Sequence, residues 1–484
     1  MSLKRNIAAI YSASLFNGVL SVIVVPLGLN RFGSAGYGLF AIYGILTLCF
    51  TLPGMGISKH FSRLLASDRI SASQSAILQI AWALRLTISA MLLVFLPVLC
   101  LIVPAFLFPV DLPDVNTVRW LVVLAAVEYL LAGPTEMMQV LCIANEKIDL
   151  YSKFTVISGL YRYALMFLGI LAFGTPLMTV ALIVSRRIID PWVAHRIMKG
   201  YPGIAWRPRF DLAAFRDFLG SSALLSLSQL VHLGMLSLGS VLANTFCGLA
   251  GLGLYRAAFD LASRLWVISN GLGLVVFPRF ACLLAVDDDN PSPALGRMSG
   301  ILDASWAGYL ALCTFGAWVA PHVLPLIGFQ PDAIQLFMLL LLGTGMNAHG
   351  NLSHEFLLAG GKYLWATLIL VAGSATLAVV FLGLHHQMGI LTLGWAWIAS
   401  QFIYATMVDI GAGTLAGDSA ATIGWQAATK ILVASAAVAA TAISLTSPVS
   451  TAILAPAFVC LLALAIALQG LRTPRHPLCE GQQA

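Results

Sequence analysis

The residues best placed to do chemistry in this sequence are charged side chains within long apolar segments. The arginines of this kind are Arg162, Arg186, Arg187, Arg256 and Arg264. Each lies in a segment long enough to cross a bilayer, where a central arginine, lysine or aspartate costs about 2.5–3.5 kcal/mol. Five arginines facing lipid would cost on the order of 15 kcal/mol, which rivals the stability of a whole protein. We therefore expect all five to face other parts of the protein or a water-filled cavity.

Carboxylates accompany these arginines. Glu128 lies near the middle of one segment, and Asp190 and Asp260 lie one helical turn after Arg186 and Arg256. A buried carboxylate can exchange protons near neutral pH. Glu128 and Asp260 are therefore candidates for coupling to protons or to another cation.

Two interpretations of the charged groups stay open. The arginine–aspartate pairs at i,i+4, and a bridge from Glu128 to Arg162, could serve only to lock helices together. However, the group around Arg186 and the group around Arg256 each sum to about plus one. Surplus buried positive charge suits an anionic ligand, and the planar guanidinium group suits phosphate oxygens. Polar stripes on neighbouring segments, such as Asn347 and Asn351, predict a polar central cavity.

The composition fixes the class of protein. Hydrophobic residues make up 60% of the chain and charged residues 10%, with a mean hydropathy of +0.92. Soluble domains carry roughly 25% charged residues. We therefore expect an all-α polytopic membrane protein of about 14 transmembrane helices. The expected spans are 7–30, 36–56, 81–108, 118–143, 153–173, 176–196, 215–243, 250–278, 299–327, 332–358, 363–384, 389–411, 426–446 and 450–471.

The loops carry an asymmetric charge. About seventeen lysines and arginines lie in loops on the side of the N-terminus, whereas Arg31 and Arg119 lie on the other side. This bias predicts that both termini are cytoplasmic. The first segment is too long for a cleavable signal peptide, and we expect it to be a membrane helix.

A repeat divides the chain. Gly36-Tyr-Gly-Leu-Phe40 recurs in the second half of the sequence as Gly251-Leu-Gly-Leu-Tyr255. We expect two six-helix lobes, 1–212 and 213–424, followed by two extra helices and a tail in 425–484. Because each unit holds an even number of helices, the repeat should be parallel, with its pseudo-twofold axis along the membrane normal.

Enzyme and metal motifs are missing from the sequence. There is no phosphate-binding loop ending in Gly-Lys-Ser/Thr, no His-Glu-x-x-His helix and no Ser/His/Asp set. We therefore expect no catalytic residue, no metal, no cofactor and no nucleic acid partner. Energy would come from an ion gradient, the substrate gradient or the membrane potential.

Three stretches resemble a known family. The stretch Ser21–Phe40 resembles the opening of polysaccharide transporters in the multidrug/oligosaccharidyl-lipid/polysaccharide (MOP) exporter superfamily, which share the MATE-like fold. Gly253–Ser263 and Phe277-Pro-Arg-Phe280 are similar to their seventh-to-eighth helix region. The resemblance implies a two-lobed transporter that alternates between inward and outward openings. It implies a cationic cavity for a diphosphate, formed by the five arginines above, with Arg31 peripheral.

The resemblance implies a flippase for an undecaprenyl-diphosphate-linked oligosaccharide in the bacterial inner membrane, feeding O-antigen, capsule or exopolysaccharide synthesis. The expected partners are the lipid-linked substrate, membrane lipids, the polysaccharide polymerase and glycosyltransferases, and we expect a monomer. One alternative is an ion-coupled multidrug exporter, although cationic drugs should be repelled by the arginines. An alternative of another class is a membrane-embedded glycan polymerase or ligase, which commonly carries a large outer loop.

Overall fold

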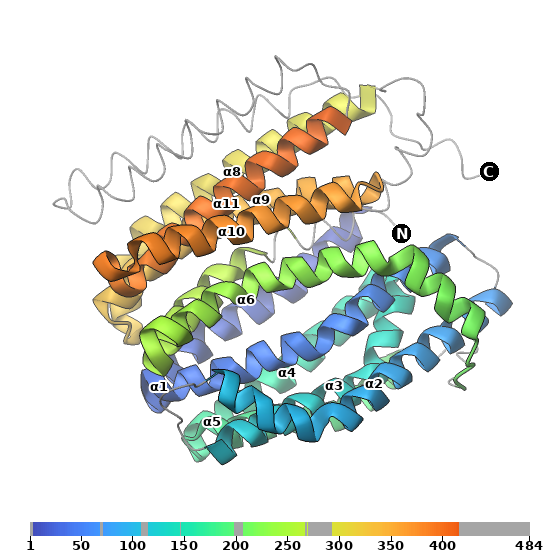
Figure 1. The fold of residues 1–484 in the computed structure, drawn as a ribbon, viewed down its shortest axis with the longest axis horizontal. Helices are drawn as coiled ribbons and strands as arrows, with labels where there is room; N and C mark the ends of the chain where they lie inside the picture. The colour runs from blue at the N-terminus through green and yellow to red at the C-terminus, as the bar shows by residue number, and fades with distance from the viewer. Residues whose placement is uncertain are drawn as a thin grey trace. The chain divides into compact units, whose positions relative to one another are not determined.

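The described part of the protein is built from helices. The computed structural model describes residues 3–67, 71–107, 115–145, 147–197, 207–266, 269 and 293–415 (Figure 1). The α-helices are α1 (Leu3–Ser67), α2 (Ser71–Leu107), α3 (Val115–Ala144), α4 (Ile148–Ala172), α5 (Pro176–Ile197), α6 (Leu212–Ala262), α8 (Pro293–Val323), α9 (Pro331–Ala359), α10 (Tyr363–Met388) and α11 (Thr392–Leu415). The short 3₁₀ turns η1 (Ser263–Leu265), η2 (Leu324–Ile327) and η3 (Gly389–Leu391) join some of them.

Seven helical segments of the described chain are long and apolar enough to cross a membrane. Three of these segments hold two helices each: α1 bends at Gly33, α6 bends at Gly248, and Tyr363–Leu415 contains α10 and α11. The all-α, multi-pass class predicted from composition is therefore confirmed. The count of 14 stays a prediction, and the expected spans 426–446 and 450–471 lie outside the described residues.

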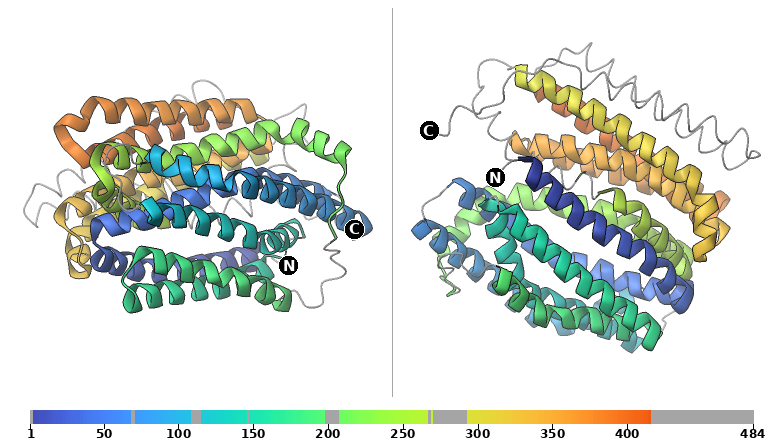
Figure 2. Two further views of the ribbon diagram at one scale, coloured as in Figure 1. Left: turned by 60° about the horizontal axis from the view of Figure 1, so that its bottom comes forward. Right: turned by 180° about the vertical axis from the view of Figure 1, so that it is seen from behind.

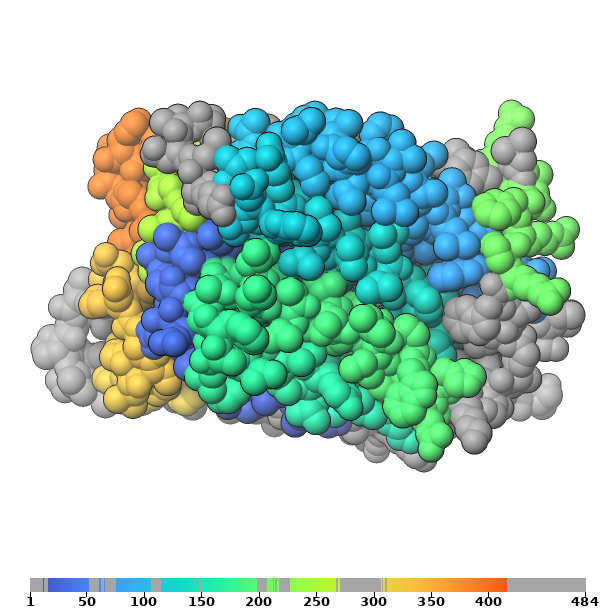
Figure 3. Space-filling model, turned by 90° about the horizontal axis from the view of Figure 1, so that it is seen from below, coloured from blue at the N-terminus to red at the C-terminus, as the bar shows by residue number. Residues whose placement is uncertain are grey.

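The outward side of α2 shows why the chain needs lipid as its solvent. Val94, Leu101 and Ile102 are 73%, 65% and 57% exposed, and the side chains of α2 lie on the surface in Figure 3. Several neighbouring apolar side chains without cover are unfavourable in water but suit hydrocarbon. This face of α2 therefore fits contact with membrane lipids.

The predicted repeat is visible in the backbone. Gly33 has φ 71° and ψ 173°, and Gly248, at the equivalent position of the second copy, has φ 68° and ψ −174°. The helices that follow also begin at matching positions of the repeat: Val115 and Pro331, Ile148 and Tyr363, Pro176 and Thr392. The recurring motif in the sequence thus reflects two copies of the same succession of helices.

Helix packing repeats as well. In the first copy α3 packs on α1, α2 and α5, and α4 packs on α1 and α5. In the second copy α9 packs on α8, α10 and α11, and α10 packs on α11. The helices of each group run side by side in both views of Figure 2. α9 is buried over most of its length, which explains why its apolar residues surround the whole helix.

The chain divides into two compact units, Met1–Ala257 and Ala258–Ala484. This division falls near the end of α6, whereas the lobe boundary predicted from the repeat falls at the start of this helix. The predicted lobes, 1–212, 213–424 and 425–484, stay a proposal.

The bend glycines give a first prediction. A backbone with φ near +70° and ψ near 180° is essentially restricted to glycine, and a side chain there costs about 1–3 kcal/mol. Gly33→Ala and Gly248→Ala should therefore each lower the thermal unfolding temperature in detergent, although an added methyl group at either position meets no neighbour within 4 Å. Gly44→Ala, also free of neighbours but inside a regular helical turn, is the control and should not lower it. Equal stability of all three variants would contradict the assignment of the bends to glycine.

Candidate functional site

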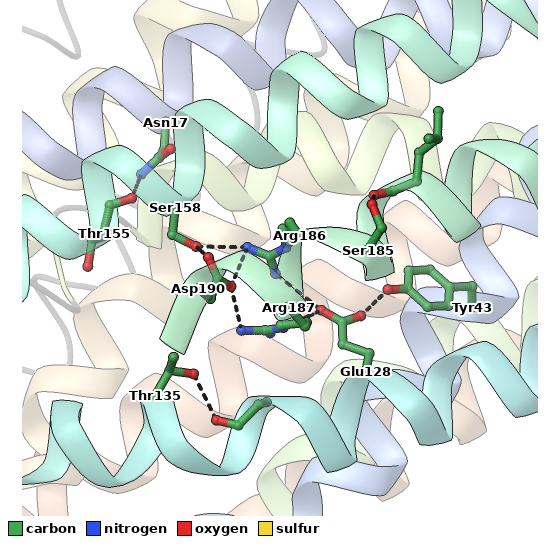
Figure 4. Close-up of polar contacts among 12 residues, drawn as sticks. Asn17, Tyr43, Glu128, Thr135, Thr155, Ser158, Ser185, Arg186, Arg187 and Asp190 are labelled. Atoms are coloured by element: carbon green, nitrogen blue, oxygen red, sulfur yellow. Dashed lines mark hydrogen bonds and ion pairs between the residues drawn. The ribbon is translucent and has the colours of Figure 1, made fainter. Parts of the chain in front are cut away.

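The charged residues of α3 and α5 meet in a buried cluster (Figure 4). Arg186 donates from Nη2 to Glu128 Oε1 over 3.1 Å. Arg187 approaches the same oxygen with Nε at 3.1 Å and Nη2 at 3.0 Å. The side chains of Arg186 and Glu128 are 7% and 5% exposed. One carboxylate therefore holds two arginines that are consecutive in α5.

Asp190 extends this cluster to α4. Its Oδ2 lies 3.4 Å from Arg187 Nη1 and 3.8 Å from Arg186 Nη1. Its Oδ1 accepts a 2.9 Å hydrogen bond from Ser158 of α4, whose hydroxyl also accepts one from Arg186 Nη1 at 3.1 Å. Ser158 and Asp190 are both buried. The aspartate thus serves both arginines and fixes α4 against α5.

Tyr43 connects the cluster to α1. Its hydroxyl donates to Oε2 of Glu128, whereas the arginines bind the other carboxylate oxygen. The two oxygens of Glu128 therefore bind groups from two different helices, α1 and α5, while the residue itself belongs to α3. Four helices meet at one polar centre.

Apolar residues lie on either side of this centre along the helices. On α5, Ile183 precedes the charged residues and Val193 follows them; on α4, Phe154 precedes Ser158 and Tyr163 follows it. Val193 and Phe154 belong to one buried apolar cluster, while Ile183 and Tyr163 belong to another. The polar layer therefore lies between two apolar cores, where its electrostatic interactions are little weakened by water.

The charges within the layer balance. Glu128 and Asp190 offset Arg186 and Arg187, so the surplus expected for the α5 residues alone disappears once Glu128 is counted. Arg162 of α4, one turn after Ser158, interacts electrostatically with Glu128 and Arg186 and is itself exposed. The positive surplus is therefore located at the exposed edge of the cluster. The side chain of Arg187 is also partly exposed, at 20%.

The second charged group lies at the end of α6 and in η1. Arg256, Asp260 and Arg264 are all half-buried, whereas residues 257–259 and 261–262 are buried. The predicted stripe therefore lies on the more open side of this helix. Arg264 donates from Nε to the backbone oxygen of Asp260 over 3.0 Å, which orients the guanidinium group along the helix.

Arg31 lies elsewhere. Its guanidinium group is next to Gly174, in the turn between α4 and α5. Arg186 comes ten residues after the start of α5, which is about 15 Å along the helix. Arg31 thus lies apart from the cluster, and its predicted peripheral role in binding stays a prediction.

Sequence reasoning missed a buried arginine in α2. Arg85 is 1% exposed, binds Glu136 of α3 through Nε at 2.9 Å, and stacks over the ring of Tyr129 with its guanidinium carbon 3.4 Å from the ring centroid. Its position inside the expected span 81–108 is the signal that could have identified it. Glu136 lies inside the expected span 118–143. Opposite charges buried in two expected spans could therefore have predicted the ion pair of Arg85 with Glu136.

A second missed group joins α9 and α11. His349 Nε2 lies 2.8 Å and 3.1 Å from the two carboxylate oxygens of Asp409, and Ser353 donates to Oδ1 of the same residue. Two polar residues one turn apart in a highly apolar segment are a signal for α9. Asp409 is harder to recognise because it lies near the end of its segment.

Metal ligands do not gather in the described residues: no three His, Cys, Asp or Glu side chains there form a group that could hold an ion.

Comparison with known proteins places the chain in a family. Residues 3–284, more than half of the sequence, match the family model described as "Polysaccharide biosynthesis protein". The chain belongs to the polysaccharide biosynthesis protein family. No curated protein matches the sequence.

Solved structures show the fold of this family member. The lipid II flippase MurJ in an inward closed conformation has a TM-score of 0.66 at 13% identity, covering 95% of this chain and 99% of MurJ. A MATE transporter has a TM-score of 0.64 at 12% identity, covering 86% and 97% of the two chains. A MOP superfamily transporter from Pyrococcus furiosus has a TM-score of 0.63 at 14% identity, again covering 86% and 97%. The chain thus shares its fold with a flippase and with membrane transporters, and the predicted resemblance to polysaccharide biosynthesis proteins with a MATE-like fold is confirmed.

The charge balance gives a second prediction. Glu128→Gln leaves two arginines against Asp190 in a buried site, and breaking a buried ion pair typically costs about 3–5 kcal/mol. We expect a large fall in thermal stability in detergent. Arg162→Gln, at an exposed position, is the control and should unfold near the wild-type temperature.

The double variant Glu128→Gln/Arg186→Gln tests the cause, since one arginine then faces one aspartate. It should be more stable than Glu128→Gln alone. If it is less stable, the packing of the side chains rather than their charge balance holds the cluster together.

Proposed function

We propose that this protein is a flippase for an undecaprenyl-diphosphate-linked oligosaccharide, moving the lipid-linked repeat unit across the inner membrane by alternating access. The exported unit would enter O-antigen, capsule or exopolysaccharide synthesis. Membership of the polysaccharide biosynthesis family and the flippase-like fold support this function.

The observation that carries the proposal is the location of positive charge at the edge of the buried cluster. The diphosphate of such a lipid is the anionic part of the substrate. Arg162 is exposed there, and Arg187 is partly exposed. Arginine binds phosphate oxygens in a bidentate manner, so these two residues would contact the diphosphate first.

The remaining arginines contribute less directly to phosphate binding in this proposal. Arg186 supports the phosphate-binding edge from within the cluster, where its guanidinium group is held by Glu128 and Ser158. Arg256 and Arg264 contribute a second half-buried cationic stripe, and Arg31 acts at the periphery. Glu128 and Asp260 are the proposed coupling residues, because Glu128 binds two arginines and Asp260 lies one helical turn from both Arg256 and Arg264.

The loop charges support a proposed orientation of the flippase in the membrane. Both termini would be cytoplasmic in the bacterial inner membrane, and the two lobes would alternate around a central cavity. The protein would act as a monomer beside the polymerase and glycosyltransferases of the same synthesis, in contact with membrane lipids.

A second candidate is an ion-coupled multidrug exporter, because MATE transporters share the fold at similar TM-scores. Cationic drugs would be repelled by the exposed arginines. For a glycan polymerase or ligase there is no corresponding observation, since the similar structures are a flippase and transporters.

Deletion of the gene gives a third prediction and separates the two candidates. Undecaprenyl-linked oligosaccharides should accumulate, accessible from the cytoplasmic face, while exported glycan falls and drug sensitivity stays unchanged. The measurement is extraction and chromatography of the lipid-linked units. Normal lipid intermediates together with raised drug sensitivity would favour the exporter.

Complementation with Arg162→Gln tests the phosphate-binding edge. A hydrogen bond to a charged group contributes about 1.5–3 kcal/mol, so export should fall about tenfold or more at unchanged protein abundance. Arg119→Gln, an exposed arginine at the start of α3, is the matched control and should restore export fully. Full export by Arg162→Gln would contradict the proposed role of this residue.

A further inference from the structure

The pair of His349 and Asp409 is a titratable group that the proposed substrate site does not use. His349 is fully buried on α9, and the Asp409 side chain on α11 is 12% exposed. The imidazole donates through Nε2 to the carboxylate, which also accepts from Ser353. Imidazole and carboxylate are side-chain groups that bind and release protons, and here they face each other directly.

Aromatic and polar groups of the described helices surround the pair. Trp306 of α8 lies edge-on to the imidazole ring, with centroids 5.0 Å apart. η1, which carries Arg264, also packs on α9, so the pair lies on a helix that contacts the second arginine group. Among the described residues, the other titratable groups nearby on the packed helices are His354 and Glu355 on α9, Tyr404 on α11, Tyr309 on α8 and Tyr363 at the start of α10.

The chemistry of the pair favours a proton over a metal ion or sodium. Hard cations prefer shells of oxygen ligands, whereas one side of this carboxylate is occupied by a ring nitrogen. Transition metals take imidazole readily, but no third ligand of the required type joins the pair among the described residues. A proton needs only the two groups present.

The His349–Asp409 pair joins the two helices that are equivalent to α3 and α5 in the first copy of the repeat. α9 and α11 take the places in the second copy that α3 and α5 take in the first, and Glu128, Arg186 and Arg187 join α3 to α5. Both copies thus link the same pair of helices by a buried polar contact. Arginines keep their charge at physiological pH, whereas the His349–Asp409 contact can gain or lose one.

We infer that the His349–Asp409 pair is a proton-binding site that couples the packing of α9 and α11 to the proton gradient. The pair carries one negative charge when the imidazole is neutral and none when it is protonated. Partial exposure of Asp409 provides access for the proton. The role of this proton in moving substrate rests on the proposed flippase function; the binding of the proton itself does not.

Trp306 makes proton binding measurable without substrate, because an imidazolium next to an indole quenches its fluorescence. We expect the emission of the purified protein in nanodiscs to change with pH in a single transition that follows the binding of one proton. The difference between wild type and Trp306→Phe isolates the signal of this indole. His349→Gln should abolish the transition, and Asp409→Asn should displace its midpoint. A transition that persists unchanged in both variants, or the absence of any in the wild type, would overturn the inference.

The coupling itself is tested in proteoliposomes that hold undecaprenyl-diphosphate-linked oligosaccharide. An imposed proton gradient should speed wild-type flipping severalfold, whereas His349→Gln should flip at the same rate with and without the gradient. Asn347→Ala is the matched control, since it removes a non-titratable contact, 2.7 Å to Gln401, between the same two helices; it should keep its response to the gradient. If fluorescence titrates but nothing is flipped, the proposed function fails while the proton site stands. If flipping is seen but His349→Gln still responds to the gradient, the coupling role fails.

Discussion

The first group of helices depends on the carboxylate of Glu128. Its two oxygens accept from Tyr43 on α1 and from Arg186 and Arg187 on α5. Within a bilayer no water is at hand to replace such partners, so a buried charge must be satisfied by the protein itself. Because two arginines rely on one residue of α3, the position of α5 is determined by this contact as much as by the apolar cores on either side. The cluster therefore sets the geometry of the edge where Arg162 is exposed.

The duplicated scaffold carries different polar groups in its two copies. The bends at Gly33 and Gly248 have nearly the same φ and ψ, so the two copies share one backbone conformation at this position. The first copy places permanent charges between α3 and α5. The second copy places amides and a histidine–aspartate pair between α9 and α11. The same pair of helices is thus joined by arginine–carboxylate contacts in one copy, and by amides and a histidine–aspartate pair in the other.

Local features of the sequence predict much of this arrangement. The expected span 176–196 corresponds to α5 and the span 332–358 to α9, because long apolar runs bounded by proline or charge leave little choice of element. The glycine-rich motif that recurs in the second half likewise predicts two equivalent copies, and the bends at Gly33 and Gly248 bear this out.

Contacts between helices are less accessible from sequence. Sequence reasoning weighed a bridge from Glu128 to Arg162, with which Glu128 does interact electrostatically, but did not predict the direct contacts of Glu128 with Arg186 and Arg187. Spacing along one helix does not reveal which face a neighbouring helix covers. Asp409 is hard to recognise as a buried partner because it lies close to the end of its apolar segment.

The division between a balanced interior and a cationic edge has a physical consequence for a carrier. A site must bind its ligand strongly enough to admit it and weakly enough to release it. A fully unpaired set of buried arginines would hold a diphosphate tightly, since little water would compete. Because Arg186 already binds Glu128 and Ser158, its attraction for a diphosphate is weaker than that of an unpaired arginine. The charge of Arg162 is exposed, so its attraction for an anion is partly screened. In the proposed flippase the carboxylates would therefore moderate the positive potential at the edge, so that the same side chains that stabilise the helices would also limit how firmly an anion is held.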